Sequence, residues 1–358
     1  MHLGLLIYGN LATLSGGFIY DRLICDHLVR QEDTVTIISL PWHSEVRTVF
    51  HNVSAALGSR LKNANIDLLI EDELNHPSCF LLNRKLKRQI NYPIVALVHH
   101  LRSCEKHPWI TRSYYASIEH LYLHSVDAFI YNGTATRSTV ESIVGKKPAV
   151  VAHPGKDRLH TTLSPQAIRR RTRAAKVLRI LFVGNVIKRK GLHTLLRALA
   201  EIDCHAWTLT VVGNTRIDEL YVATIQRYIH KKKLKKSVTF LGTITDRELI
   251  SHFSNHDILV VPSSYEGLGI IYTEALAFGV PSIGTTSGGA REIIQHGVTG
   301  FLVPPDRPAI LGQYLQKIAN DRTLLAQLSL AARSAYELHP TWSETAHTIR
   351  KFLKNLSA

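Results

Sequence analysis

Residues 265–281, YEGLGIIYTEALAFGVP, combine a glycine-spaced turn with the start of a short helix. Gly279 followed by Pro281 marks the end of that helix, because glycine accepts a positive φ and proline cannot continue a helix. The predicted helix therefore covers residues 270–278, and residues 267–269 form the turn at its N-terminus. Unpaired backbone N–H groups and the positive end of the helix dipole make such a start suitable for binding an anion.

Two acidic residues flank this turn. Glu266 and Glu274 stand on either side of the predicted anion site. A carboxylate beside a bound phosphate is repulsive unless it binds another group, and sugar hydroxyls suit it because they donate to an acceptor-only carboxylate. Glu274 also has a purely structural alternative, since the helix dipole stabilises an acid near the start of a helix. The segment predicts a ligand that carries both phosphate and hydroxyl groups.

Outward from this stretch, both halves of the chain alternate short apolar runs with helical patterns, which is typical of parallel βαβ units. We expect strands at residues 3–8, 34–39, 67–70, 94–98, 128–131 and 149–151, and again at 179–183, 208–212, 238–241, 258–261 and 282–284. The predicted fold is α/β, with two Rossmann-like, doubly wound parallel sheets facing each other across a cleft. Such sheets bind ligands beyond the carboxyl ends of their strands, so the cleft is the expected site.

The length of 358 residues predicts two domains, at roughly 150 residues per domain. The periodicity lapses between residues 153 and 176, where His-Pro-Gly, Ser-Pro and a cluster of arginines follow one another. We expect an N-terminal domain at residues 1–158, a linker at 159–176 and a C-terminal domain at 177–335. The amphipathic tail, residues 336–358, is expected to contain a helix that returns towards the N-terminal domain.

The bulk composition favours a cytoplasmic protein. No apolar run approaches the ~18 residues needed to span a bilayer, and the N-terminus lacks the basic region and cleavage site of a signal peptide. The four cysteines form no CxxC pair, which favours free thiols in a reducing compartment over disulfides or a zinc site. None of the 20 histidines falls in a zinc-binding pattern, so no metal is expected.

The formal net charge of +15 is unevenly distributed along the chain. Residues 1–160 are net +3 and residues 161–358 are net +12, with basic runs at 169–179 and 231–236. Such runs are usually solvated, and the alternatives are attraction to an anionic membrane or to nucleic acid. Nucleic acid is not expected as a partner, because no RNA-binding aromatic motif, helix-turn-helix pattern or zinc finger accompanies the runs.

Three neighbouring segments carry a resemblance to a known family: VPSSYEGLGIIYTEALAFGVP at residues 261–281, SGGAREII at 287–294 and GVTGFLV at 297–303. Together they strongly resemble the retaining family-4 glycosyltransferases, which have the two-domain GT-B fold. The resemblance is dense in the C-terminal half and looser in the N-terminal half. It implies transfer of a hexosyl unit from a nucleoside-diphosphate sugar, UDP- or GDP-linked, to an acceptor hydroxyl, with retained anomeric configuration and without a metal.

The resemblance also implies roles for individual residues. Glu274 would bind the ribose hydroxyls of the donor, and Glu266 would contact the transferred sugar near its 3-hydroxyl. The backbone amides near Ile270 and Ile271 would hold the diphosphate. Lys190 resembles the family's phosphate-binding lysine.

The loop that contains Lys190 departs from the family pattern. The family commonly has an arginine directly after the first glycine of the segment GNVIKRKG, where this chain has Asn185. Either Arg189 or Lys188 supplies the missing charge, or Lys190 and the backbone hold the diphosphate alone. The alternative is an ordinary basic surface loop.

The N-terminal half offers a glycine pair and a histidine pair. Gly16 and Gly17 open a predicted helix, and in the family this pair closes over the donor phosphates; a plain tight turn is the alternative. His99 and His100 follow the strand at 94–98, where the family often has a histidine followed by aspartate. We expect His99 to bind hydroxyls of the donor sugar and to shape the acceptor site, with His100 as the second candidate. A structural hydrogen-bonded pair is the alternative.

Two further segments concern the acceptor. Glu71, Asp72 and Glu73 are superficially like the Asp-x-Asp that holds a divalent cation in other glycosyltransferases, but those enzymes have a single Rossmann domain. We therefore expect no metal site there and place Glu71 and Asp72 on the acceptor side. Residues 81–90 suit an interfacial helix at an anionic membrane, and hence a lipid-linked acceptor. An ordinary amphipathic surface helix explains the same pattern equally well.

The predicted site therefore draws on both halves of the chain. The residues expected to act in catalysis are Glu266, His99 and Lys190, and those expected to bind the donor are Gly16, Gly17, Asn185, Arg189, Lys190, Gly267, Leu268, Gly269, Ile270, Ile271 and Glu274. Two alternative functions remain: a sugar-nucleotide epimerase of the same fold, which typically lacks the Glu-x7-Glu block, and a non-catalytic basic binder of nucleotide sugars or nucleic acid. The expected location is the cytoplasm, with a peripheral position at the inner face of the membrane as the alternative.

Overall fold

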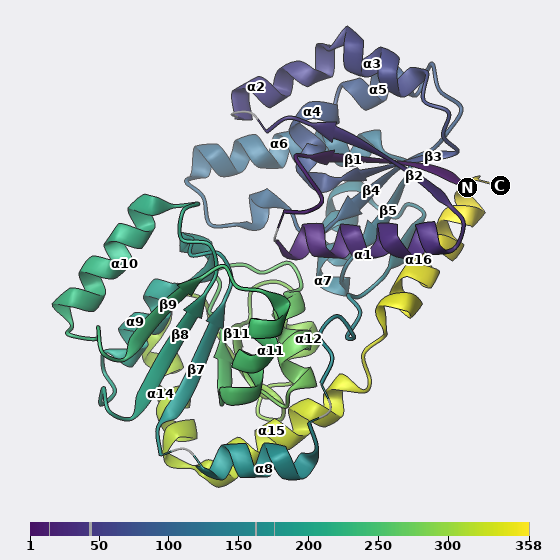
Figure 1. Cartoon of the computed structure of the whole chain (residues 1–358). Helices are drawn as coiled ribbons and strands as arrows, with labels where there is room; N and C mark the ends of the chain where they lie inside the picture. Colours follow the sequence, from purple (N-terminus) through teal and green to yellow (C-terminus); the bar gives the residue numbers. More distant parts are fainter. Residues whose placement is uncertain (14, 43–44, 162, 175, 358) are drawn as a thin grey trace. The chain divides into compact units, whose positions relative to one another are not determined.

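The computed structural model describes residues 1–13, 15–42, 45–161, 163–174 and 176–357. The chain forms two compact units (Figure 1), Met1–Gly155 together with Pro340–Ala358, and Lys156–His339. Each unit is built on one six-stranded sheet, and the strands of both sheets pair in parallel. The prediction of an α/β fold with two parallel sheets is confirmed.

The sheet of the first unit has the strand order β2-β1-β3-β4-β5-β6. Its strands are β1 (His2–Tyr8), β2 (Thr34–Leu40), β3 (Leu68–Asp72), β4 (Ile94–Val98), β5 (Ala128–Tyr131) and β6 (Ala149–Val151). The helices are α1 (Gly16–Arg30), α2 (Glu45–Val49), α3 (Ala55–Lys62), α4 (His76–Cys79), α5 (Leu82–Leu86), α6 (Trp109–Ser125), α7 (Thr134–Val144) and α16 (Trp342–Ser357), with 3-10 helices η1 (Phe50–Val53), η2 (Glu73–Asn75) and η3 (Arg102–Cys104). β4 is buried along its whole length, as central parallel strands are, which explains its unbroken apolar sequence.

The sheet of the second unit has the strand order β12-β11-β10-β7-β8-β9. Its strands are β7 (Leu178–Val183), β8 (Trp207–Val212), β9 (Val238–Gly242), β10 (Ile258–Val260), β11 (Ser282–Thr285) and β12 (Gly300–Val303). The helices are α8 (Pro165–Ala174), η4 (Lys188–Lys190), α9 (Leu192–Leu199), α10 (Glu219–Lys231), α11 (Asp246–Asn255), α12 (Ile270–Ala277), α13 (Ala290–Ile293), α14 (Pro308–Asn320) and α15 (Arg322–Tyr336). The glycine-spaced turn quoted above follows β10, an interior strand, so it emerges at the carboxyl edge of this sheet.

A helix occupies much of the stretch 159–176 that the sequence predicts as a linker. α8 packs against α15 and belongs to the second unit. Only Ile168 and Thr172 of α8 are buried, and the other residues are largely charged, small or polar. An apolar face of this size produces almost no periodic signal in the sequence, which is why the helix was missed.

The two leucines on the apolar face of the amphipathic segment at residues 81–90 pack into the protein. α5 ends at Leu86, and both Leu82 and Leu86 are buried in the core of the first unit. The structure thus favours the alternative of an ordinary surface helix. Among the described helices, none is both long and apolar enough to cross a bilayer.

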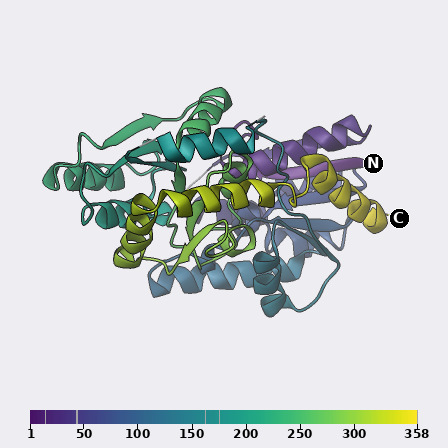
Figure 2. The same cartoon turned by 90° about the horizontal axis from the view of Figure 1, so that it is seen from below.

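The chain ends on the unit in which it begins. α16 packs along α1, and the two termini lie side by side in both views (Figures 1 and 2). Asp33 links α16 to the N-terminus. Its carboxylate accepts hydrogen bonds from Arg350 Nε of α16 (2.5 Å) and from the amino group of Met1 (3.0 Å).

Glu71 on β3 is fully buried, so we leave it out of the proposed acceptor side. Its carboxylate accepts a hydrogen bond from Asn83 Nδ2 (2.9 Å). Burial raises the pKa of Glu71 from 4.5 to about 7, against the lowering effect of hydrogen bonds from Asn83, Tyr122 and Cys79. The folded state therefore holds a proton that the unfolded chain has released, and this contribution to stability is lost as the pH rises from about 4.5 to about 7.

Glu71→Gln should remove this pH dependence, because glutamine does not titrate. The free energy of unfolding of the variant, relative to that of the wild type, should increase by on the order of 1–3 kcal/mol between about pH 5 and pH 8. Denaturant unfolding across this range measures the difference. Glu32→Gln, at an exposed position, is the matched control. A difference for Glu71→Gln that stays constant with pH would contradict the assignment.

Candidate functional site

The start of α12 has the geometry that the sequence predicts for an anion site. Gly269, the residue before the helix, has a φ of +82°, and a Cβ there would lie 2.7 Å from the Tyr272 ring. No side chain caps this helix start. The helix follows the carboxyl end of β10, where parallel α/β sheets bind their ligands. Its first-turn N–H groups are therefore suited to a phosphate.

Glu266, just before this turn, is held as a buried carboxylate by a lysine. Lys190 Nζ donates to both of its oxygens (2.9 and 2.7 Å), and Ser263 Oγ donates to one of them (2.8 Å). Burial raises the pKa of Glu266. The charges of Lys190 and Arg189 and the hydrogen bonds from Lys190 and Ser263 have a larger, lowering effect, and the resulting pKa is about 2. Glu266 is thus ionised at neutral pH, and the structure brings the two predicted catalytic residues of this unit into direct contact.

The glycine pair of the segment SGGAREII supports the backbone of Glu266. Gly288 forms a parallel bridge with Glu266, and the N–H of Gly289 donates to the Glu266 carbonyl (2.9 Å). A Cβ on Gly288 would lie 1.9 Å from the Glu266 carbonyl oxygen, and a Cβ on Gly289 would lie 2.1 Å from the Gly267 carbonyl oxygen. Neither position can carry a side chain without moving the turn that precedes α12.

Lys190 ends η4, the loop after β7, and its aliphatic stem runs over Gly184. A Cβ on Gly184, whose φ is +147°, would meet Lys190 Cε at 3.4 Å. Asn185 is half-buried, and its carbonyl accepts from the N–H of Ile187 (2.8 Å). Arg189 donates through Nη1 to the Tyr265 carbonyl (3.1 Å), so it also supports the turn next to Glu266.

Glu274, in the second turn of α12, is paired with an arginine that sequence reasoning missed. Arg158 donates from Nε to Glu274 Oε1 (2.5 Å) and from Nη1 to Asp246 Oδ1 (2.6 Å). Burial raises the pKa of Glu274, and Arg158 only partly offsets this effect. No motif pointed to Arg158, because it is a single basic residue in a loop far from Glu274 in the sequence.

In the first unit, the structure brings the glycine pair and the first histidine together. Gly16 and Gly17 form the first turn of α1, whose N-cap Ser15 accepts from the N–H of Phe18 (3.4 Å). A Cβ on Gly17 would lie 3.2 Å from Cδ2 of His99, so the imidazole ring lies against the start of this helix.

His99 is held as a cation by acidic residues. Its Nε2 donates to Asp21 Oδ1 (3.0 Å), and its backbone N–H donates to Glu73 Oε2 (3.0 Å). Burial lowers the pKa of His99, but the negative charges of Asp21, Glu73 and Asp72 raise it, and the result is about 10. His100 is instead engaged by Glu105, with His100 Nε2 and Glu105 Oε1 2.7 Å apart.

Asp72, the second residue expected on the acceptor side, is also buried. Its Oδ1 accepts from the N–H of Leu74 (2.7 Å) and so caps η2. Asp21, Asp72 and His99 place possible metal-ligand atoms within 4.8 Å of one another. A doubly protonated imidazole has no lone pair for a metal, so this group is better explained as an ion-paired cluster.

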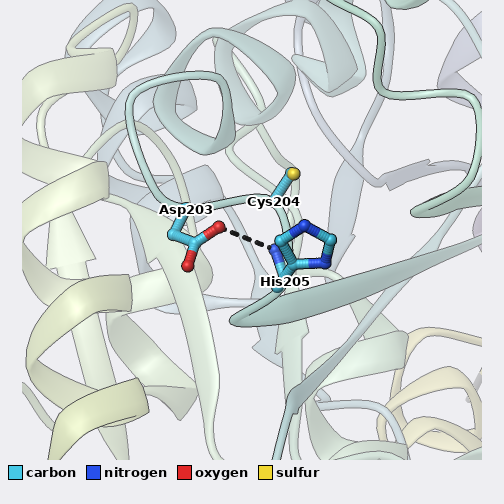
Figure 3. A group of neighbouring side chains, drawn as sticks. All are labelled: Asp203, Cys204 and His205. Atoms are coloured by element: carbon cyan, nitrogen blue, oxygen red, sulfur yellow. Dashed lines mark hydrogen bonds between the residues drawn. The ribbon is translucent and has the colours of Figure 1, made fainter.

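A second group with metal-ligating atoms, Asp203, Cys204 and His205, is formed by consecutive exposed residues (Figure 3). The Asp203 carboxylate accepts from the backbone N–H of His205 (3.0 Å), which accounts for its position as part of a turn before β8. The Cys204 sulfur points away from this carboxylate in Figure 3. Nothing else at this turn indicates a ligand.

The comparisons with known proteins agree with this geometry. Residues 165–335 match the family of glycosyl transferases group 1. A GDP-mannose-dependent alpha-(1-6)-phosphatidylinositol monomannoside mannosyltransferase of Mycobacterium tuberculosis is 28% identical over 241 residues, which is 64% of this chain and 62% of that protein. A glycogen synthase of the same species is 22% identical over 81% of this chain and 70% of that protein. This chain thus spans less than two thirds of the mannosyltransferase.

Solved structures share the fold over nearly the whole chain. Sucrose-phosphate synthase from Thermosynechococcus elongatus has a TM-score of 0.83 at 20% identity, covering 99% of this chain and 98% of its own. Anabaena Alr3699/HepE in complex with UDP-glucose has a TM-score of 0.79 at 18% identity, covering 99% and 100%. These likenesses and the two parallel sheets show the fold that the resemblance implies, the two-domain GT-B fold.

Residues 165–335 match the model of the glycosyl transferases group 1, and the segments at residues 261–303 lie within this match. The resemblance expected from residues 261–303 is therefore confirmed.

Proposed function

We propose that the protein transfers a hexosyl unit from a nucleoside-diphosphate sugar to an acceptor hydroxyl, with retention and without a metal. The observation that carries this proposal is the contact between Lys190 and Glu266 beside the uncapped start of α12. It joins a cation and free N–H groups, which suit a diphosphate, to an ionised acceptor for sugar hydroxyls. The UDP-glucose bound to the Anabaena structure and the GDP-mannose named for the mycobacterial relative support this class of donor.

The second unit would bind the donor. Lys190 and the first-turn amides of α12, at Ile270 and Ile271, would stabilise the charge that grows on the departing diphosphate. Glu266 would orient the transferred sugar, and Glu274 would accept from the ribose hydroxyls. A phosphate oxygen of the leaving group would take the acceptor proton, so no protein nucleophile is required.

In the first unit, the start of α1 at Gly16 and Gly17 would offer N–H groups to the donor phosphates. The adjacent His99 would offer a charged hydrogen-bond donor to the donor sugar and would shape the acceptor site. His100 takes no direct role in this proposal, because Glu105 engages it.

We place the protein in the cytoplasm, in line with its four free cysteines. The acceptor is a glycan, a lipid-linked hydroxyl compound or a small molecule. Contact with an anionic membrane would involve Trp109 and Ile110, which are 77% and 64% exposed at the start of α6 beside the basic residue Arg112. Co-sedimentation with anionic but not with neutral vesicles tests this contact.

Incubation with a panel of UDP-, GDP- and ADP-sugars, with nucleoside diphosphate release as the readout, tests the proposed activity. We expect release with one donor, accelerated by a hydroxyl acceptor, and a product with the donor's anomeric configuration. A sugar-nucleotide epimerase would change the sugar while the nucleotide stays attached. A non-catalytic binder would retain the donor without turnover.

Asp21→Asn should make turnover depend on pH, because Asp21 has the largest effect among those that raise the pKa of His99. In the wild type His99 stays protonated up to about pH 10. Deprotonation of His99 should therefore cause no fall in kcat/KM between about pH 7 and pH 9. In the variant, with only Asp72 and Glu73 opposing burial, kcat/KM should fall as the pH rises through the lowered pKa. Asp26→Asn, an exposed change on the same helix, should leave the profile unchanged. Matching profiles for Asp21→Asn and wild type would contradict this role of Asp21.

A further inference from the structure

The ion pair between Arg158 and Glu274 has no part in the roles given above. Arg158 lies outside the residues 165–335 that match the family, and its side chain is only 10% exposed. We propose that Arg158 is a positioning residue of the nucleotide site, which holds the Glu274 carboxylate charged and oriented for the ribose hydroxyls of the donor. This inference rests on the proposed function and deepens it, since it specifies a ribonucleotide with free hydroxyls.

Arg158 holds the Glu274 carboxylate through one of its two oxygens, Oε1. The planar guanidinium of Arg158 is anchored by two acids on different helices, Glu274 of α12 through Nε and Asp246 of α11 through Nη1. Two such bonds set the plane of the guanidinium and, with it, the direction of Glu274 Oε1. Among the described residues, none donates to Glu274 Oε2. This second oxygen is the one left to accept from a ligand.

The electrostatics explain why a buried acceptor needs this partner. Glu274 is 3% exposed, and burial favours its neutral form, as does the nearby negative charge of Asp246. Arg158 is the group that opposes both effects, by its charge and by its hydrogen bond. A protonated carboxyl would present a hydroxyl where the ribose needs an acceptor. Arg158 therefore favours the ionised form of Glu274, which accepts from hydroxyl groups.

Calorimetric titration with matched nucleotides tests this role without any need for turnover. The probes are UDP and GDP, each with its 2′,3′-dideoxy counterpart, against wild type, Arg158→Gln, Glu274→Gln and the double variant. We expect Arg158→Gln to weaken binding of the ribonucleotide about ten- to a hundredfold, the range for a lost hydrogen bond to a charged group. Binding of the dideoxy nucleotide should change less than about threefold. In the Glu274→Gln background, Arg158→Gln should cause no further loss.

The pH dependence gives a readout that a merely structural role would not affect. In Arg158→Gln the pKa of Glu274 rises further, because the group that lowers it is gone. The loss of ribonucleotide affinity relative to wild type should therefore grow as the pH falls. Arg158 and Asp246 are the charged groups that face this carboxylate. The dideoxy nucleotide, measured in parallel, removes the contribution of the phosphate's own protonation.

Two controls separate folding from binding. Arg170→Gln, at an exposed position of α8, should leave affinity unchanged. Arg158→Lys, which keeps the charge but not the planar fork, should give an intermediate loss. If Arg158→Gln alone does not fold, the double variant removes both charges and is compared with Glu274→Gln.

Three results would overturn the role of Arg158. These are unchanged ribonucleotide affinity, an equal loss for the dideoxy nucleotide, and a further loss in the Glu274→Gln background. Failure of the wild type to bind either nucleoside diphosphate is a different outcome, since it would remove the proposed function and this role with it.

Discussion

Lys190→Ala should lower kcat by about 10²- to 10³-fold, the usual effect of removing one donor from a developing oxyanion. Lys190 Nζ lies within 2.9 Å of both oxygens of Glu266, which stands just before the turn that leads into α12. In the proposed reaction it stabilises the diphosphate as the bond to the sugar breaks. Steady-state kinetics with the donor identified by the nucleotide-release panel measure the effect.

The same change should also destabilise the fold, because it leaves Glu266 as a buried carboxylate without its cation. Breaking a buried ion pair on one side typically costs about 3–5 kcal/mol, and Arg189 and Ser263 remain to offset part of it. The thermal stability of the variant should therefore be measured alongside its kinetics. Lys235→Ala, at an exposed lysine of the same unit, is the matched control for both measurements. A Lys190→Ala variant within threefold of wild-type turnover would remove Lys190 from the proposed mechanism.

Gly288→Ala should abolish nucleotide binding and lower the stability of the second unit by about 2–4 kcal/mol, the combined range for overpacking and backbone strain. Gly288 has a φ of +89°, and a methyl group there would lie 1.9 Å from the Glu266 carbonyl oxygen. Because that atom belongs to the backbone, relief requires movement of the turn before α12. The methyl group would displace Glu266 and the anion site together.

Gly297→Ala separates the two causes of the loss at Gly288, which are the clash with the Glu266 carbonyl and the strain of a positive φ. Gly297 has a similar φ of +80°, but a Cβ there would meet no heavy atom within 4 Å. Its substitution should cost only the strain of the backbone, about 1 kcal/mol, and leave nucleotide affinity within a few fold. Equal losses at both positions, measured by calorimetry and chemical unfolding, would show that contact with Glu266 is not what excludes a side chain at Gly288.

The layout of the sheets could be predicted from the sequence because buried parallel strands leave a direct signal. Strands at 94–98, 128–131 and 149–151 appear in the structure with the expected bounds, since each is an apolar run between polar loops. The turn before α12 and the end of that helix could be predicted equally well, because the glycines of the turn and the Gly279-Val280-Pro281 segment indicate specific backbone conformations. α8 was missed because it has few buried residues, and β12 was missed because its first residue is glycine, which is depleted in strands.

The partners of the site residues could not be predicted in the same way. Arg158 and Asp21 contact Glu274 and His99 across 116 and 78 positions of the chain, and neither lies in a motif. Ion pairs of this kind are fixed by the tertiary fold, and a single sequence gives no sign of which charged residues meet. The sequence also suggested an acceptor role for Glu71, and burial, which no short pattern reveals, argues against it.

The return of the chain to its first unit means that the second unit is, in covalent order, an insertion. Both of its ends, at residues 156 and 339, connect to the same unit, and α16 belongs to that unit. A stop codon shortly after residue 339 would therefore remove a helix from the first unit and leave the second unit with its full sequence.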